Sequence, residues 1–261
     1  MPVRIVTDSS AGLPAEIARE LGITVVPMHV LNDSGDQSTA GLGALELTAA
    51  YARQLERGED AGVVALHLSK ELSSTWAAAT QAAAIFDGLV HVVDTQTVGM
   101  AIGAAAMAAA RLAAEGASLD ECVAVARDVL DRSETWLYLH RLDAIRKSGR
   151  ISAATAVVSS ALATRPLMRV EHGRLELAVK SRTQSKAFAR LVESIRQRAE
   201  GEKVFVMLQQ HDAAAEASEL QRQMERQLPG GSTFLICPLE ATSAVHAGPG
   251  AIGVSVVYSR D

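Results

Sequence analysis

Small hydroxyl and acidic side chains follow three hydrophobic runs in the first hundred residues, at the point where each run ends. VRIV leads into Thr7–Ser10, VVALHL leads into Ser69 and Leu72–Thr75, and HVV leads into Asp94 and Thr95. In an open parallel sheet, ligands bind beyond the carboxyl ends of the strands, where helix N-termini present free N–H groups to anions. The pattern therefore predicts one site that offers several donors to an anionic group.

Ser73 is the serine of this set that stands where a strand turns into a helix. Its hydroxyl and the adjacent amides could hold a carboxylate against the positive end of the helix dipole. The alternative is a serine that only caps the helix, and Thr7–Ser10 are open to the same two interpretations.

Two further residues that could handle an anion lie in glycine-containing segments of the second half. His246 stands in the segment VHAGPGA, where the glycines allow close approach of a ligand and hold the histidine on a constrained turn. No Lys-Ser/Thr pair follows, so the segment is a weak match to a phosphate-binding loop. Arg150 follows Gly149 and could supply a planar fork for carboxylate or phosphate. A structural histidine and a surface arginine are the alternatives.

Other catalytic patterns find little support. A Ser/His/Asp hydrolase can be assembled from Ser73, His246 and either Asp8 or Asp94, but no serine stands in a G-x-S-x-G elbow. CxxC, HExxH and a dinucleotide-binding GxGxxG after a strand are all absent from the sequence, so neither a metal nor a nicotinamide cofactor is indicated. Two cysteines, Cys122 and Cys237, lie far apart in apolar contexts and are expected to be buried thiols.

The elements that must position these residues alternate between strand and helix in the first half. Strands are expected at 3–6, 23–30, 63–68 and 89–93, and helices at 13–21, 44–57 and 76–85, with a loop over 32–43. Ser118 and Glu121 form a capping box for a helix that reaches Leu130. This alternation predicts a parallel sheet in a first α/β domain over residues 1–131, with 98–110 as a buried helix.

The second half combines a hairpin with further β-α-β elements, which predicts a mixed sheet in a second α/β domain over 132–261. The hairpin turn is placed at His172 and Gly173. Strands are expected at TWLYLH, KVFVML, STFLIC and VSVVY, helices before 148, over 152–164, 183–199 and 213–228, and a loop at HAGPGAIG.

Charge and hydropathy exclude some classes of function. The net charge of −5 argues against nucleic-acid binding. Between His140 and Arg190, however, eleven Lys or Arg residues face three acids, so this segment could receive an anionic group or an acidic partner, or be a solvated surface. No apolar stretch reaches the ~20 residues of a membrane span, and no signal peptide is recognisable, so a cytoplasmic protein is expected.

Seven motifs in the same order make the sequence resemble the DegV family, which includes the fatty-acid-binding subunits of bacterial fatty acid kinase. The family's TDSs resembles Thr7–Ser10, SSxLSGTY resembles Ser69–Trp76, its Asp-Ser element resembles Asp94-Thr95, GGRIS resembles Ser148–Ser152, KPIL resembles Arg165–Met168, KxRT resembles Lys180–Thr183, and HxGPGA resembles His246–Ala251.

This resemblance implies a two-domain α/β protein that holds a long-chain fatty acid in a tunnel between the domains and has no cofactor and no turnover of its own. It implies a carrier that presents the acyl carboxylate to a separate ATP-dependent kinase for phosphorylation. Ser73 and Thr39 would hold the carboxylate, with Arg150 and His246, both cations when protonated, beside it and assisting phosphoryl transfer. Ser74, Thr7, Ser9, Asp94 and Gly248 complete the expected ligand site, and Arg182 and Lys180 the expected kinase-docking surface.

The chain departs from the family pattern at three places. The TSxPS loop is reduced to Ser38–Leu42, in which only Thr39 matches, and Ser74 and Ser148 replace glycines of the family motifs. These differences affect the carboxylate end of the expected site. The alternative to a carrier is a stand-alone enzyme, a hydrolase or an acyl or phosphoryl transferase, that uses Ser73 and His246.

Overall fold

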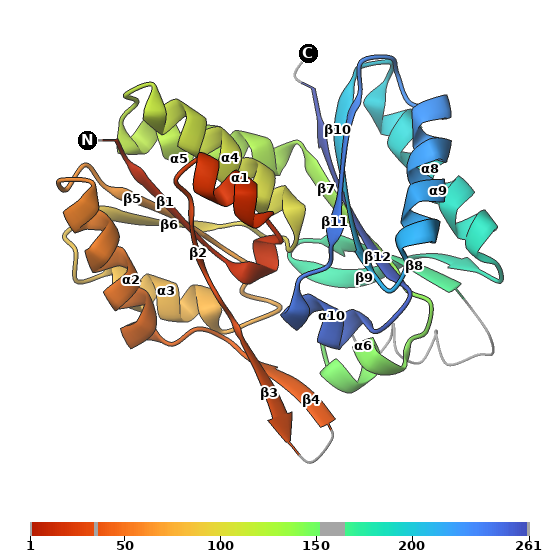
Figure 1. Cartoon of the computed structure of the whole chain (residues 1–261), viewed down its shortest axis with the longest axis horizontal. Coiled ribbons are helices and arrows are strands. Elements are labelled where there is room, and N and C mark those ends of the chain that lie inside the picture. Colours follow the sequence, from red (N-terminus) through yellow and green to blue (C-terminus); the bar gives the residue numbers. More distant parts are fainter. Residues whose placement is uncertain (1, 34–35, 152–164, 260–261) are drawn as a thin grey trace. The chain divides into compact units, whose positions relative to one another are not determined.

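The computed structural model of the protein describes residues 2–33, 36–151 and 165–259. The chain divides into two compact units, Met1–Asp131 and Arg132–Asp261, which we call the N-terminal and C-terminal units. Each unit contains one main β-sheet with helices packed against it (Figure 1). The predicted α/β class, with a parallel sheet in the first half and a mixed sheet in the second, is confirmed.

The main sheet of the N-terminal unit has four parallel strands in the order β2-β1-β5-β6. Their bounds are Thr24–Val26 for β2, Arg4–Asp8 for β1, Val63–His67 for β5 and Val90–Asp94 for β6. Because neighbouring strands run in the same direction, the polar residues that follow β1, β5 and β6 meet at one edge of the sheet, as predicted.

Helices cover both faces of this sheet. Figure 1 shows α2 and α3 on one face and α1, α4 and α5 on the other. The short 3₁₀ helix η1 covers Ser9–Ala11, α1 Ala15–Glu20, α2 Ala44–Arg57, α3 Thr75–Ala83, α4 Met100–Ala114 and α5 Leu119–Asp131. On the α2 face, Leu47 and Tyr51 pack against Val6 and Ala65 in a largely aliphatic core.

The alanine-rich α4 is buried around most of its circumference, which confirms the predicted buried helix. Small side chains allow a helix to approach a sheet closely, and here Gly103 leaves room for the Ala11 carbonyl, which would lie 3.2 Å from a Cβ at position 103. The predicted capping box of α5 is confirmed: the Ser118 N–H and hydroxyl donate to the Glu121 carboxylate at 2.8 and 2.7 Å.

Residues 23–43 differ from the prediction. The expected strand over 23–30 is split into β2 and β3 (His29–Asp33), because Pro27 between them has no N–H for a sheet ladder. The expected loop over 32–43 contains β4 (Asp36–Ala40), which pairs antiparallel with β3 and places Val30 opposite Thr39. This two-stranded sheet is separate from the main sheet, so β4 lacks the hydrophobic alternation that marks a half-buried strand.

The C-terminal unit contains a six-stranded mixed sheet in the order β11-β10-β12-β7-β8-β9. Only the β10–β11 pairing is parallel among the pairings of this described sheet. The strands are β7 Ser133–Tyr138, β8 Arg165–Glu171, β9 Arg174–Ser181, β10 Val204–His211, β11 Thr233–Pro238 and β12 Ala251–Tyr258. The predicted hairpin is confirmed, and its turn residues His172 and Gly173 both have positive φ, at 50° and 79°.

Four described helices accompany this sheet. They are α6 (Asp143–Ser148), α8 (Gln184–Ala199), α9 (Ala214–Gln227) and α10 (Ala241–Ala247). Phe188 and Leu191 of α8 and Leu220 of α9 are buried against sheet residues such as Tyr138 in the main core of the unit. The helix predicted over 152–164 lies outside the described residues.

The loop predicted at HAGPGAIG is wrong at both ends, because His246 and Ala247 form the last turn of α10 and residues 251–253 belong to β12. The helix begins after Glu240, whose carboxylate accepts hydrogen bonds from the N–H groups of Thr242 and Ser243 at 3.0 and 3.2 Å. A glutamate in this capping position is a weaker sequence signal than Ser, Thr, Asp or Asn, which explains why the helix was missed.

None of the described helices combines the length and apolar character that crossing a bilayer requires.

Candidate functional site

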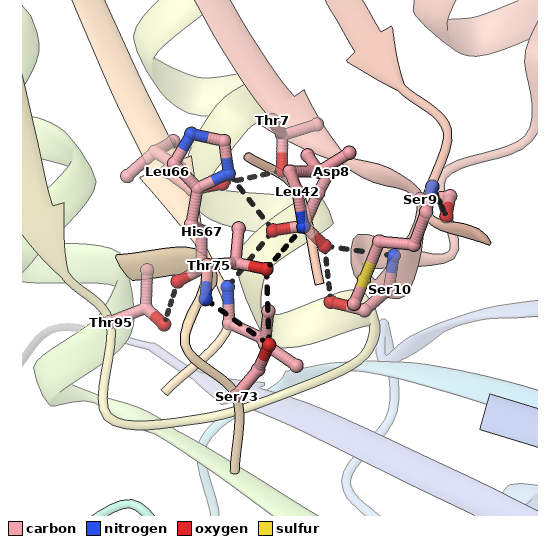
Figure 2. Close-up of polar contacts among 12 residues, drawn as sticks. Thr7, Asp8, Ser9, Ser10, Leu42, Leu66, His67, Ser73, Thr75 and Thr95 are labelled. Carbon is pink, nitrogen blue, oxygen red and sulfur yellow. Dashed lines mark hydrogen bonds and ion pairs between the residues drawn. The ribbon is translucent and has the colours of Figure 1, made fainter. Parts of the chain in front are cut away.

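Two of the hydroxyl groups at the predicted sheet edge complete hydrogen bonds of the sheet itself. Thr7 is buried and donates its hydroxyl proton to the Leu66 carbonyl at 2.6 Å, and Thr95 does the same to the His67 carbonyl at 2.6 Å (Figure 2). These two hydrogen bonds link the end of β5 to β1 and to the residue that follows β6. Thr7 therefore contributes to the shape of the sheet edge, and its predicted contact with a ligand stays a prediction.

The Asp8 carboxylate accepts hydrogen bonds from several residues at this edge of the sheet. Its Oδ1 accepts hydrogen bonds from the N–H and the hydroxyl of Ser10, at 2.9 and 2.5 Å. Its Oδ2 accepts from His67 Nδ1 at 3.0 Å and from the Leu68 N–H at 3.1 Å. A buried carboxylate is stable only when its charge is compensated by such donors, and this one joins the ends of β1 and β5.

His67 continues the chain of contacts to Tyr51 of α2, whose hydroxyl lies 2.8 Å from His67 Nε2. Burial, and secondarily the charge of Asp8, raise the pKa of Tyr51, so its hydroxyl stays protonated and donates to Nε2. With Nε2 as the acceptor, the ring proton on Nδ1 donates to Asp8. His67 and Tyr51 were missed at the sequence level; the available signal was a single titratable residue inside the otherwise apolar run VVALHL.

Ser73, Ser74 and Thr75, which follow β5 and end at the first residue of α3, form what we call the hydroxyl cluster. A Cβ added to Gly41 would lie 3.0, 3.2 and 2.9 Å from their three hydroxyl oxygens, respectively. The cluster therefore converges on the backbone of the turn that joins β4 to α2. Thr39 lies on β4, two residues before Gly41 in this turn, and its predicted contact with a carboxylate beside Ser73 stays a prediction.

Ser73 does not cap α3 in the expected way. The N-cap position belongs to Ser74, whose side chain makes no capping bond, whereas Ser73 Oγ accepts the Thr75 N–H at 3.2 Å and lies 3.0 Å from Thr75 Oγ1. Thr75 Oγ1 in turn accepts the Leu42 N–H at 3.1 Å (Figure 2). These bonds hold the hydroxyl cluster against the β4–α2 turn.

Two other predicted ligand residues of the N-terminal unit are already engaged. Asp94 pairs with Lys70 at 3.1 Å, and the Lys70 ammonium also lies 5.3 Å from the centre of the Trp76 ring. Ser9 Oγ accepts the Met28 N–H at 3.0 Å (Figure 2). Ser9 and Asp94 stay predictions as ligand contacts.

The predicted residues of the C-terminal unit come together from α6 and α10, which pack against each other. Gly149 ends α6 with a left-handed φ of 69° and is followed by Arg150, which interacts electrostatically with His246 of α10. Gly248 ends α10, and a Cβ there would lie 3.2 Å from that of Ala144 in α6. The small residues Gly248 and Ala144 thus allow α10 and α6 to pack closely, which brings the segment at 246–250 near the segment at 148–150.

His246 is uncharged at neutral pH. Burial and, to a smaller extent, the nearby Arg150 guanidinium lower the pKa of His246 to about 4, although Glu240 opposes the shift. At neutral pH His246 therefore contributes no positive charge, and its predicted place beside the ligand stays a prediction. A neutral imidazole at this position can donate one hydrogen bond and accept another.

The predicted docking residues lie at the end of the hairpin. Lys180 belongs to β9, and Arg182 follows that strand immediately before the helix α8. Both side chains are exposed. Nothing in their surroundings contradicts a role in contacts with a partner, which stays a prediction.

The described residues do not favour the alternative chemistries. Asp8, one of the two carboxylates available for a Ser/His/Asp hydrolase, orients His67, and the other, Asp94, pairs with Lys70. No group of three His, Cys, Asp or Glu side chains within residues 2–33, 36–151 and 165–259 is placed to hold a metal ion. Cys122 and Cys237 are buried thiols that form no disulfide, as expected.

A family model described as "Uncharacterised protein, DegV family" matches residues 34–259. The chain belongs to the DegV family. A curated DegV domain-containing protein of Corynebacterium glutamicum, Cgl2349/cg2579, is 59% identical over 261 residues, which cover 100% of this chain and 95% of the relative.

Solved DegV structures share the fold over the whole chain. The crystal structure of the DegV family protein Cg2579 from C. glutamicum has a TM-score of 0.98 at 58% identity, covering 100% of this chain and 98% of the other. A DegV family protein from Thermus thermophilus, whose structure is described as showing fatty acid binding, has a TM-score of 0.90 at 28% identity, covering 99% and 100%.

Proposed function

We propose that this DegV protein binds one long-chain fatty acid and presents its carboxylate to a separate ATP-dependent kinase, which converts the carboxylate to an acyl-phosphate. The observation that carries the proposal is the hydroxyl cluster, in which Ser73, Ser74 and Thr75 converge beside the turn that follows Thr39. The likeness of the whole chain to the fatty-acid-binding T. thermophilus protein supports the same ligand.

The hydroxyl cluster suits a carboxylate because that group only accepts hydrogen bonds and needs several donors once it leaves water. Ser73 and Ser74 retain solvent exposure, whereas Thr75 is buried behind them. An acyl chain supplies the remaining affinity, since each buried CH₂ contributes about 0.8 kcal/mol. The tunnel between the domains that the family resemblance implies stays a prediction.

We assign the phosphoryl-transfer step to Arg150 and His246. The Arg150 guanidinium offers a positive charge, and a neutral His246 imidazole is able to donate one hydrogen bond and to accept another. Negative charge increases when a carboxylate becomes an acyl-phosphate, so donors and cations contribute more in the transition state than in the bound acid. The chain itself is a carrier in this proposal, and the partner kinase supplies ATP and turnover.

Native mass spectrometry of the freshly purified protein tests the proposed ligand. The expected spectrum contains a species heavier than the polypeptide by one long-chain fatty acid, which solvent extraction releases and identifies. Delipidated protein that regains this species with an added fatty acid, but not with the methyl ester of the same acid, would support recognition of a free carboxylate. A protein that is purified without lipid and also fails to bind added fatty acid would contradict the proposal.

Arg182→Glu is expected to slow kinase-dependent phosphorylation of the bound fatty acid at low ionic strength and to have a smaller effect at high salt. Opposite charges on two partners raise the rate of encounter, and salt screens that attraction over about 10 Å at 0.1 M. Fatty-acid affinity and thermal stability should stay near wild type, because Arg182 is exposed.

Arg53→Glu is the matched control for Arg182→Glu. It makes the same charge change at an exposed position in the middle of α2, outside the basic segment over 140–190. Equal slowing by the two variants would show a general charge effect and remove Arg182 from the docking surface. Loss of lipid binding in Arg182→Glu alone would instead assign the residue to the ligand site or the fold.

A further inference from the structure

The hydrogen bonds of Thr75 determine which way the protons of the hydroxyl cluster point. Thr75 is buried, and its Oγ1 accepts the Leu42 N–H at 3.1 Å. The same oxygen lies 3.0 Å from Ser73 Oγ, so one of the two hydroxyls must donate to the other. Because Ser73 Oγ also accepts the Thr75 N–H at 3.2 Å, the two possible directions have different consequences for a ligand.

If Ser73 donated to Thr75, the Thr75 hydroxyl proton would be left without an acceptor. Its two interactions within the described part of the chain are those with Leu42 and Ser73. An unsatisfied buried donor costs more free energy than a typical hydrogen bond contributes. If Thr75 donates to Ser73 instead, its own proton is satisfied, and Ser73 Oγ accepts two hydrogen bonds. The Ser73 proton then remains for a partner outside the cluster.

We propose that Thr75 is a positioning residue that makes Ser73 a pure donor and thereby sets the preference of the site for a headgroup that only accepts hydrogen bonds. The relay runs from the Leu42 N–H to Thr75 Oγ1, from the Thr75 hydroxyl to Ser73 Oγ, and from the Ser73 hydroxyl to the ligand. This inference rests on the proposed fatty-acid carrier function and concerns how the same site recognises an ionised carboxylate.

The hydrogen-bonding properties of a carboxylate favour donation from Thr75 to Ser73 and from Ser73 to the ligand. An ionised carboxylate has no proton to give, so a Ser73 that presented a lone pair would repel it. Successive hydrogen bonds in one direction also polarise each other, which strengthens the last donor of the series. A neutral primary alcohol of the same chain length can donate as well as accept, so it gains less from a donor with a fixed direction.

Gly41 is the residue that permits the relay. The backbone at Gly41 runs so close to the hydroxyl cluster that a Cβ would lie 2.9 Å from Thr75 Oγ1 and 3.0 Å from Ser73 Oγ. These are shorter than ordinary contacts of a methyl group, so an alanine must displace the hydroxyls. Gly43, two residues further along the same turn, has nothing within 4 Å of its Cβ position and provides a matched control.

A double-mutant cycle with Ser73→Ala and Thr75→Val tests the relay, with the dissociation constant of a delipidated protein for one defined fatty acid as the readout. Thr75→Val keeps the shape of the side chain and is expected to weaken binding roughly threefold to tenfold, while Thr75→Ser, which keeps the hydroxyl, should bind within about twofold of wild type. In the Ser73→Ala background, Thr75→Val should add less than about twofold, because residues that act through each other are not additive. The ratio of fatty-acid to fatty-alcohol affinity should fall in Thr75→Val.

Three outcomes would overturn the relay. Tighter fatty-acid binding by Thr75→Val would mean that Ser73 donates to Thr75, and an equal loss of affinity from Thr75→Val in the wild-type and Ser73→Ala backgrounds would mean that the two residues act independently. A Thr75→Ser variant that binds fatty acid as weakly as Thr75→Val would indicate a packing role for Thr75. If Thr75→Val does not fold, Gly41→Ala and Gly43→Ala decide, with a loss of about tenfold expected for the first and less than twofold for the second. A wild-type protein that binds no fatty acid would defeat the proposed function as well, whereas a binding wild type with additive variants defeats the relay alone.

Discussion

Ser73→Ala is expected to weaken binding of a long-chain fatty acid roughly tenfold to a hundredfold. Hydrogen bonds to charged groups are worth about 1.5–3 kcal/mol, and a desolvated carboxylate that loses one donor regains nothing from water. The alanine variant should keep its fold, because Ser73 is only partly buried and its Oγ accepts only local hydrogen bonds, from the Thr75 N–H and, in the proposed relay, from the Thr75 hydroxyl. Isothermal titration of delipidated protein measures the change directly.

Ser218→Ala is a suitable control for Ser73→Ala, since it removes a partly exposed hydroxyl in α9 that donates to the Ala214 carbonyl of its own helix at 2.8 Å. Its affinity for fatty acid should equal that of the wild type. Unchanged affinity in Ser73→Ala, with thermal stability also unchanged, would show that the carboxylate is held elsewhere.

His246→Ala is expected to retain most of its fatty acid but to lose kinase-dependent formation of acyl-phosphate by about a hundredfold or more. Removing one preorganised donor to the charge that develops in a transition state costs about 10²–10³ in rate. Because His246 is neutral at neutral pH, its contribution there is a hydrogen bond or a proton transfer and not a fixed charge. Lipid-loaded variant and purified kinase, assayed for acyl-phosphate with hydroxylamine, provide the measurement.

His246→Gln separates the two remaining roles of the imidazole. A glutamine amide donates a hydrogen bond but does not carry a proton at neutral pH, so partial activity in this variant indicates hydrogen bonding, and activity as low as that of His246→Ala indicates proton transfer. Full activity of His246→Ala would contradict both roles. Parallel loss of lipid and of thermal stability would instead assign His246 to the packing of α10 against α6.

Local signals made much of the fold predictable. The apolar runs of β1, β5 and β6, the capping box at Ser118 and the His172-Gly173 turn each act through residues close in sequence. The β3–β4 hairpin was missed because β4 is a polar strand outside the main sheet, and α10 because Glu240 supplies an unusual cap.

The candidate site was predictable in its residue types but not in its connections. Ser73 and Thr39 are 34 positions apart in the sequence. The turn that follows Thr39 meets the hydroxyl cluster through the close approach of the Gly41 backbone, which no local pattern reveals. His67 and Tyr51 act through a contact 16 residues apart in sequence. The neutral state of His246 follows mainly from burial in the folded unit, which residue identity alone does not reveal.

In the proposed carrier, the β3–β4 hairpin supplies part of the headgroup site from outside the main sheet. β3 and β4 form a sheet of their own outside the four-stranded sheet, and Thr39 lies on β4 two residues before Gly41, whose backbone approaches the hydroxyl cluster. Lengthening a surface connection costs only about 0.6 kcal/mol for each doubling of its length, far less than a change in a buried strand. In the proposed carrier, insertions or exchanges within this hairpin are therefore expected to change which headgroup is accepted while the four-stranded sheet is retained, and chimeras that swap residues 29–40 between DegV proteins test this expectation.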